Sequence, residues 1–359
     1  MNTESGPGQD LRVEGDTLNS WKDRGIEEGL AYVRERFEPE SLSALSIEEK
    51  EKLFEQARLV INTLHENGME ISDEDSDMEK IAVALQQLDY HKTEHTHGVI
   101  EGTKEILRAM KRGGMEITDA DMADGEIASA FHDTAQEWEA DVVVEGQLKY
   151  VRRKRSVGKN EETSAREAED FLKKANDEAG QEVFGKASMA QVPRAIRGTV
   201  PGFDPKLKTV IQPNVAGDAS PVERAVAFSD LRTAGMGDLT ADNPDGKAEA
   251  FLKEGDALFR EENLDIRVAL VSDKEIPDEL KQFFRQRMLR WISFQTDFAA
   301  GRKEKVSQEI KALPQGAQEE MHTLFSEFDN IIESARSRAQ KVKTLSFDEL
   351  AREMGYMVA

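Results

Sequence analysis

Two short stretches of the chain hold four of its six histidines, and both could bind a metal ion. In the first, His91 and His95 are four residues apart and would share one face of a helix, whereas His97 would point to the opposite side. In the second, His132 and Asp133 end an apolar run, where an unpaired carboxylate is unfavourable. Imidazole nitrogen and carboxylate oxygen together suit a divalent ion such as Mn, Fe, Co, Ni, Zn or Mg.

The amino-acid composition narrows the chemistry further. The 359 residues include no Cys, which excludes disulfides, thiolate zinc sites, iron–sulfur clusters and cysteine nucleophiles. Any metal site must therefore be built from His, Asp and Glu.

The net charge of -23 argues against two classes of partner, since so acidic a surface repels long nucleic acids and anionic membranes. It remains compatible with a small phosphate ester held by a metal ion. No stretch is long and apolar enough to span a bilayer, and the first residues lack the features of a signal peptide. A cytoplasmic protein is expected.

The elements that must position the histidines are expected to be helices. Aromatic residues make up only 6% of the chain and there are only 10 prolines, which favours an all-α fold. Helix starts are predicted at Ser46, Ser220 and Ser346, each of which is followed three residues later by Glu.

Changes in composition predict the organisation of the chain. Residues 1–20 are polar and without periodicity, as in a disordered tail. We expect a metal-binding helical domain over 21–237, a linker over 238–246 and a C-terminal helical region over 247–359. An apolar stripe in that last region, which includes Trp291 and Phe294, is expected to be core or a homodimer contact.

Three motifs in this chain resemble those of the HD-domain superfamily of metal-dependent phosphohydrolases. They are HTHGV at 95–99, ASAFHDT at 128–134 and AVAFSDL at 225–231. The resemblance covers roughly residues 80–237 and implies an HD-type helical bundle in which a divalent metal is bound by His95, His132, Asp133 and Asp230. The chain has no further histidine between His132 and His322, which favours one ion.

Each ligand has a second interpretation. His91 or His97 could replace His95, the pair His132 and Asp133 could be a buried polar pair without metal, and Asp230 could be a solvated helix residue.

The catalytic and phosphate-binding groups are less well marked. Asp133 is the expected catalytic carboxylate, and Glu137, one helical turn later, could orient the attacking water or be an exposed helix residue. Basic residues could bind the phosphate or be a solvated surface run; the candidates are Lys149, Arg152, Arg153, Lys154, Arg155, Arg194 and Arg197.

Three functions fit the sequence. The first is a phosphohydrolase acting on a small phosphorylated metabolite, with a nucleotide as the expected substrate. The second is a catalytically silent HD-like module that binds a nucleotide or a protein partner. The third is a helical scaffold with incidental histidines and a C-terminal dimer interface.

Overall fold

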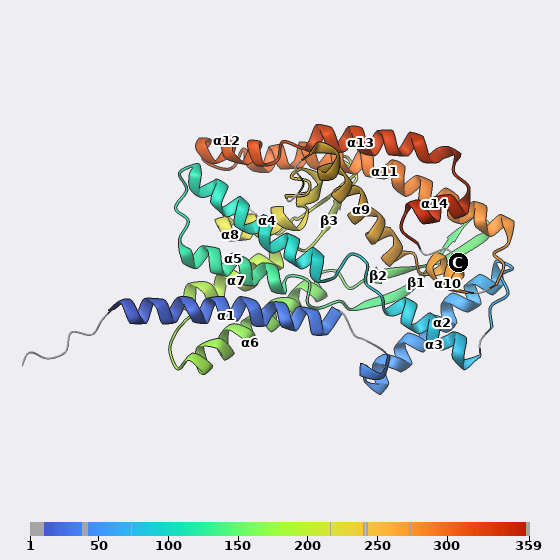
Figure 1. The fold of residues 1–359 in the computed structure, drawn as a ribbon, viewed down its shortest axis with the longest axis horizontal. Coiled ribbons are helices and arrows are strands. Elements are labelled where there is room, and N and C mark those ends of the chain that lie inside the picture. Colours follow the sequence, from blue (N-terminus) through green and yellow to red (C-terminus); the bar gives the residue numbers. More distant parts are fainter. Residues whose placement is uncertain are drawn as a thin grey trace, which may run out of the picture.

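The computed structural model describes residues 11–37, 42–72, 74–215, 217–239, 241, 243–272 and 274–356. Helices dominate these residues, which confirms the predicted all-α class (Figure 1). Two antiparallel hairpins interrupt them: β1 (Trp138–Glu145) pairs with β2 (Leu148–Arg155), and β3 (Gly202–Asp204) pairs with β4 (Thr209–Ile211). Within the described ranges, no helix combines the length and the apolar character needed to cross a bilayer.

One apolar cluster lies among the helices that carry the predicted metal ligands, with Ile127 and Val192 fully buried in it. The helices around it are α1 (Leu11–Phe37), α4 (Thr93–Arg112), α5 (Asp119–Phe131), α6 (Lys159–Ala179), α7 (Lys186–Gly198), α8 (Pro221–Asp230) and α12 (Gln315–Leu324). Helix α4 packs against both α5 and α8. This packing brings together the ends of the elements that carry the predicted ligands.

A second apolar cluster lies beside the β1–β2 hairpin, among α2 (Ile47–Glu66), α3 (Asp75–Gln86), α10 (Leu264–Val271) and α14 (Phe347–Glu353). Two further helices, α11 (Asp278–Ile310) and α13 (Phe328–Lys341), lie side by side and contribute to both clusters (Figure 1). Helix α9 (Pro244–Glu262) does so as well. Short 3-10 helices occur at Leu42–Ala44, Arg232–Ala234 and Val342–Thr344.

The three predicted helix starts are confirmed. The hydroxyl of Ser46 accepts from the backbone N–H of Glu49, and the Glu49 carboxylate accepts from the backbone N–H of Ser46, which completes a capping box. The same reciprocal pair begins α14 at Ser346. At Ser220 the hydroxyl caps α8, and Pro221 occupies the first turn, where a missing N–H leaves no hydrogen bond unmade.

The N-terminal prediction needs a correction. Residues 11–20, expected to belong to a disordered tail, lie in α1, whose Leu18 and Trp21 pack against the first apolar cluster. Residues 1–10 lie outside the described residues.

The predicted linker over 238–246 overlaps the start of α9 at Pro244. Each apolar cluster contains residues from both sides of this segment: Ile127 and Phe251 share one, and Leu64 and Phe284 share the other. The division of the chain at 238–246 stays a prediction.

Asp124 on α5 gives the fold a testable pH dependence. Its side chain is 2% exposed, and burial raises its pKa from 3.8 to about 6. Because the folded pKa is raised, the stabilising contribution of this group is complete below about pH 4 and is lost as the pH rises through 6. We expect Asp124→Asn to raise the free energy of unfolding by about 3 kcal/mol at pH 8 and to change it little at pH 4.

Denaturant titrations of both proteins at the two pH values measure this difference. An equal change in the free energy of unfolding at pH 4 and pH 8 would contradict the assignment to the Asp124 carboxyl.

Candidate metal centre

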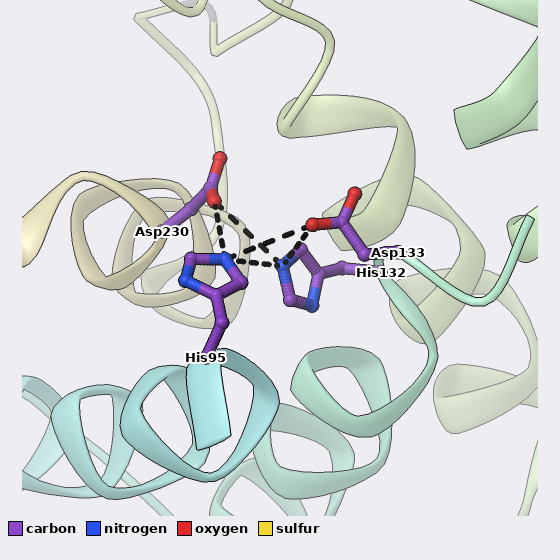
Figure 2. Close-up of side chains that lie close together, drawn as sticks. All are labelled: His95, His132, Asp133 and Asp230. Atoms are coloured by element: carbon purple, nitrogen blue, oxygen red, sulfur yellow. Dashed lines mark hydrogen bonds and ion pairs between the residues drawn. The ribbon is translucent and has the colours of Figure 1, made fainter. Parts of the chain in front are cut away.

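The structure brings the four predicted ligands into one group, called here the His/Asp cluster (Figure 2). It consists of His95, His132, Asp133 and Asp230, and one ligand atom from each lies within 4.8 Å of those from the others. His95 comes from the first turn of α4, His132 and Asp133 directly follow α5, and Asp230 is the last residue of α8. This buried group could hold a metal ion.

The distances inside the His/Asp cluster fit ligands around one ion. The Nε2 atoms of His95 and His132 are 3.4 Å apart. Oδ1 of Asp230 lies 3.4 Å from Nε2 of His95 and 3.6 Å from Nε2 of His132. Oδ2 of Asp133 lies 3.7 and 3.2 Å from the same two nitrogens. Neighbouring ligands at about 2.1 Å from an ion are separated by about 3.0 Å in octahedral and about 3.4 Å in tetrahedral geometry, so these distances also allow a coordination shell with positions left for water.

A close approach of α8 to α4 positions Asp230. A Cβ on Gly102 would lie 2.2 Å from Oγ of Ser229, so only glycine allows this contact. The Ser229 hydroxyl donates to the carbonyl of Val99 over 2.7 Å, which ties the end of α8 to α4. The Gln212 amide donates to Oδ2 of Asp230 over 3.0 Å, which leaves Oδ1 toward the imidazoles.

Each imidazole has a supporting group at Nδ1, on the side of the ring that faces away from the centre of the His/Asp cluster. Nδ1 of His132 donates to the carbonyl of Ser129 over 2.7 Å, so in the neutral ring Nε2 would present its lone pair to the centre of the His/Asp cluster. Oε1 of Glu254 lies 3.7 Å from Nδ1 of His95, and the Thr233 hydroxyl donates to the same carboxylate. A carboxylate or carbonyl behind a histidine is the usual support of a metal ligand.

A buried network of charges supports Asp133. One terminal nitrogen of Arg155 donates to Oδ1 of Asp133 over 3.2 Å, and the other lies 2.7 Å from Nε2 of His91. On the other side of that ring, Nδ1 of His91 lies 2.5 Å from a carboxylate oxygen of Glu261. His91 is therefore part of this supporting network and contacts the cluster through Arg155. This position favours His95 over His91 as the ligand.

The carboxylates control the protonation of the imidazoles. Burial by itself lowers the pKa of His95, but hydrogen bonding to Asp230 and Glu254 outweighs it and raises the pKa to about 9. The pKa of His132 is raised well above its usual value, because Asp133 and Asp230 outweigh its burial. The pKa of Asp133 is lowered well below its usual range, because the charges of His132, Arg155 and His91 together outweigh burial. A metal ion must therefore displace protons from the imidazoles.

Glu137 does not occupy the predicted position. Helix α5 ends at Phe131, so Glu137 is not one helical turn beyond Asp133. Its side chain is exposed and pairs with Nζ of Lys159 at 2.5 Å. The prediction placed Glu137 by assuming that the helix continues past the His-Asp pair, and that assumption is wrong. A role of Glu137 in orienting a water or completing the metal site stays a prediction.

Five of the seven basic residues considered for phosphate binding pair with carboxylates outside the His/Asp cluster. The pairs are Lys149 with Glu66 at 2.6 Å, Arg152 with Asp141 at 3.1 Å, Arg153 with Glu261 at 3.7 Å, Arg194 with Glu223 at 3.2 Å and Arg197 with Glu162 at 2.7 Å. Among the described side chains, none of the five forms a hydrogen bond or ion pair with the cluster. Their role in phosphate binding stays a prediction.

The alternating directions of the side chains on β2 explain why one of the basic residues in 149–155 does contact the His/Asp cluster. Successive side chains of a strand point to opposite faces. Val151 and Arg153 are buried and Arg155 is half-buried, whereas Arg152 and Lys154 are exposed. Arg155, the last residue of the run, therefore points inward to Asp133.

Sequence reasoning missed two residues next to the cluster. The ring of Tyr90 lies 4.4 Å from that of His95, and Glu254 lies behind the same histidine. Glu254 follows Asp230 by 24 residues, in the region assigned to a separate unit, and its surroundings on α9 do not mark it. Trp291 and Phe294, expected in the core or a dimer contact, line a cavity that reaches Asp230.

No family model matches the chain, and no curated protein or solved structure is detectably similar to it. The resemblance to the HD-domain superfamily therefore stays a prediction that depends on the three motifs of the sequence.

Proposed function

We propose that this protein binds one divalent metal ion at the His/Asp cluster and hydrolyses a phosphate ester or anhydride of a small metabolite, with a nucleotide as the expected substrate. One observation carries the proposal. The four residues that resemble the HD-superfamily ligands in sequence order, drawn from three helix ends, present their ligand atoms to a common centre.

The bound ion would lower the pKa of a water molecule and neutralise charge on the phosphoryl oxygens. The protein's own residues then have separate tasks. Asp133 remains the proposed catalytic carboxylate, with its outer oxygen held by Arg155. Glu254 replaces Glu137 as the proposed proton acceptor, since it lies beside His95 and its side chain is 28% exposed. Tyr90 covers the ring of His95 and shields it from water.

A second candidate function is metal binding without catalysis. Apart from the two histidines of the His/Asp cluster itself, Arg155 is the one basic side chain that forms an ion pair with a carboxylate of the cluster in the part of the chain that the structure describes. A site with so few positive groups for a phosphate also suits a catalytically silent module that holds a metal and binds a nucleotide or a protein.

Phosphate release separates the two functions. We expect the purified protein, loaded in turn with Mn, Co, Ni, Zn and Mg, to release phosphate from at least one member of a panel of nucleotides and generic phosphoesters. Asp133→Asn should abolish the release, since it removes a charged ligand and the proposed catalytic group. A protein that binds metal but turns over no member of the panel would favour the silent module.

A further inference from the structure

A cavity of about 270 Å³ lies beside the His/Asp cluster, and Asp230 forms part of its wall. Tyr90 and Glu254, both next to His95, also line it. Sites for drug-sized ligands usually measure about 300–1,000 Å³. This cavity therefore suits one ring system of a substrate whose phosphate lies at the metal, and is too small for a whole nucleotide.

Aromatic side chains form the apolar wall of this cavity. Trp291, Phe294 and Phe298 recur at helical spacing on α11, and their neighbouring ring centroids are 6.0 and 6.2 Å apart. Phe251 of α9 stacks on Phe298 at 6.1 Å, and Phe203 of the β3–β4 hairpin faces Phe294. Flat rings pack well against such side chains, because stacking needs only a π-face.

Two polar groups that line the cavity, those of Gln295 and Glu262, can accept hydrogen bonds from a ligand. Gln295 is 3% exposed, and its Nε2 donates to Asp256 over 3.4 Å, whereas its Oε1 has no partner. No residue that the structure describes forms a hydrogen bond or ion pair with the carboxyl of Glu262, whose pKa is raised to about 7 by burial and by the charge of Glu261. An acceptor left unsatisfied in such a site is unfavourable unless a ligand supplies a donor.

The lining also excludes a second phosphate. It contains Asp230, Glu254 and Glu262 but, among the described residues, no Lys, Arg or His. A phosphate group there would meet carboxylates without a compensating cation. A ring that carries N–H donors would instead satisfy both Gln295 and Glu262.

The geometry points to this cavity as the binding site for an amino-substituted aromatic ring, of the aminopurine or aminopyrimidine kind, whose N–H groups donate to Gln295 and Glu262. That the ring belongs to a phosphorylated substrate rests on the proposed function. Binding of the ring itself does not.

Nucleosides test the ring site without any turnover. Titrations of the full-length protein with adenosine, inosine, cytidine and uridine, followed by the fluorescence of Trp291, give four dissociation constants. Adenosine and cytidine carry an amino donor where inosine and uridine carry a carbonyl acceptor. We expect each amino nucleoside to bind at least about ten-fold tighter than its carbonyl counterpart, since mismatched buried acceptors repel. Trp291→Phe assigns the signal, because the chain has two other tryptophans.

Variants of residues on α9 test which side chain causes the preference for amino nucleosides. Glu262→Gln replaces an acceptor by a group that also donates, and should reduce the preference for adenosine over inosine by about ten-fold. Glu249→Gln is the matched control: it lies on the same helix, is exposed and pairs with Lys253, and should leave all four constants unchanged.

Each outcome decides one proposal. Equal binding of amino and carbonyl nucleosides, no binding of either, or tighter binding of an alkylammonium ion such as choline would overturn the ring site. Selective nucleoside binding without phosphate release would leave the ring site intact and contradict the hydrolase. Phosphate release at equal rates from nucleotides with amino and with carbonyl bases would support the hydrolase and contradict the ring site.

Discussion

Replacing His132 by alanine is expected to remove the tightly bound divalent metal and to lower phosphate release by more than about a hundred-fold, since loss of an outer-shell partner alone reduces metal affinity or activity about 10–100-fold. His132 presents Nε2 to the other three members of the His/Asp cluster at 3.2 to 3.6 Å. Alanine removes one of the four ligand atoms and leaves Asp133 and Asp230 close together with a single imidazole, so the ion loses a ligand and the two carboxylates lose a partner.

Elemental analysis of the purified protein measures bound metal directly, and thermal unfolding with and without added metal gives a second readout. Metal should raise the Tm of the wild-type protein, because it binds only the folded state, and should not raise that of His132→Ala. The matched control is His97→Ala, which removes an exposed histidine from the first turns of α4. Retention of one metal per chain by His132→Ala, or its loss from His97→Ala, would refute the proposed centre.

The four residues of the His/Asp cluster could be predicted from the sequence because their signals are local. The His-Asp pair and Asp230 each end an apolar helical segment, where a polar group needs a partner, and His95 lies four residues from another histidine. The order of the three segments then supplied the resemblance. None of this required knowledge of how the helices pack.

The helical position predicted for Glu137 is wrong because the length of a helix is set partly by distant contacts. Nothing in residues 128–137 is a strong helix stop. In the folded protein the N–H of Ala135 donates to the hydroxyl of Ser164, and the Thr134 hydroxyl donates to the carbonyl of Phe131. These bonds replace the helical ones and end α5 at Phe131. Ser164 lies on α6, so local sequence could not reveal the contact.

The β1–β2 hairpin was missed for a related reason. Its second strand is rich in Arg and Lys, which indicate a solvated surface when read alone. Arg153 is nevertheless buried, with its guanidinium 4.1 Å from the Trp138 ring and bonded to the carbonyl of Leu85. Its polar partners, the carbonyl of Leu85 and the carboxylate of Glu261, lie more than 60 residues away in sequence, and only the tertiary structure identifies them.

Substitution of Arg155 by methionine should weaken metal binding and destabilise the protein together. Methionine keeps much of the side-chain volume but removes the charge that joins Asp133 to His91. Breaking a buried ion pair by removing one partner costs about 3–5 kcal/mol. Because Arg155 orients a ligand, we also expect metal affinity to fall about 10–100-fold. Metal titration followed by calorimetry, and denaturant unfolding of the metal-free protein, measure the two effects separately.

Two variants distinguish orientation of Asp133 from a general loss of structure. Lys154→Met removes the neighbouring charge from the exposed face of β2 and should change neither quantity by much. Arg155→Lys keeps the positive charge but cannot bridge Asp133 and His91 with two nitrogens of one planar group. It should therefore recover part of the stability and little of the metal affinity. Full recovery of metal affinity by lysine would mean that charge alone, rather than the fork between the two residues, holds Asp133 in place.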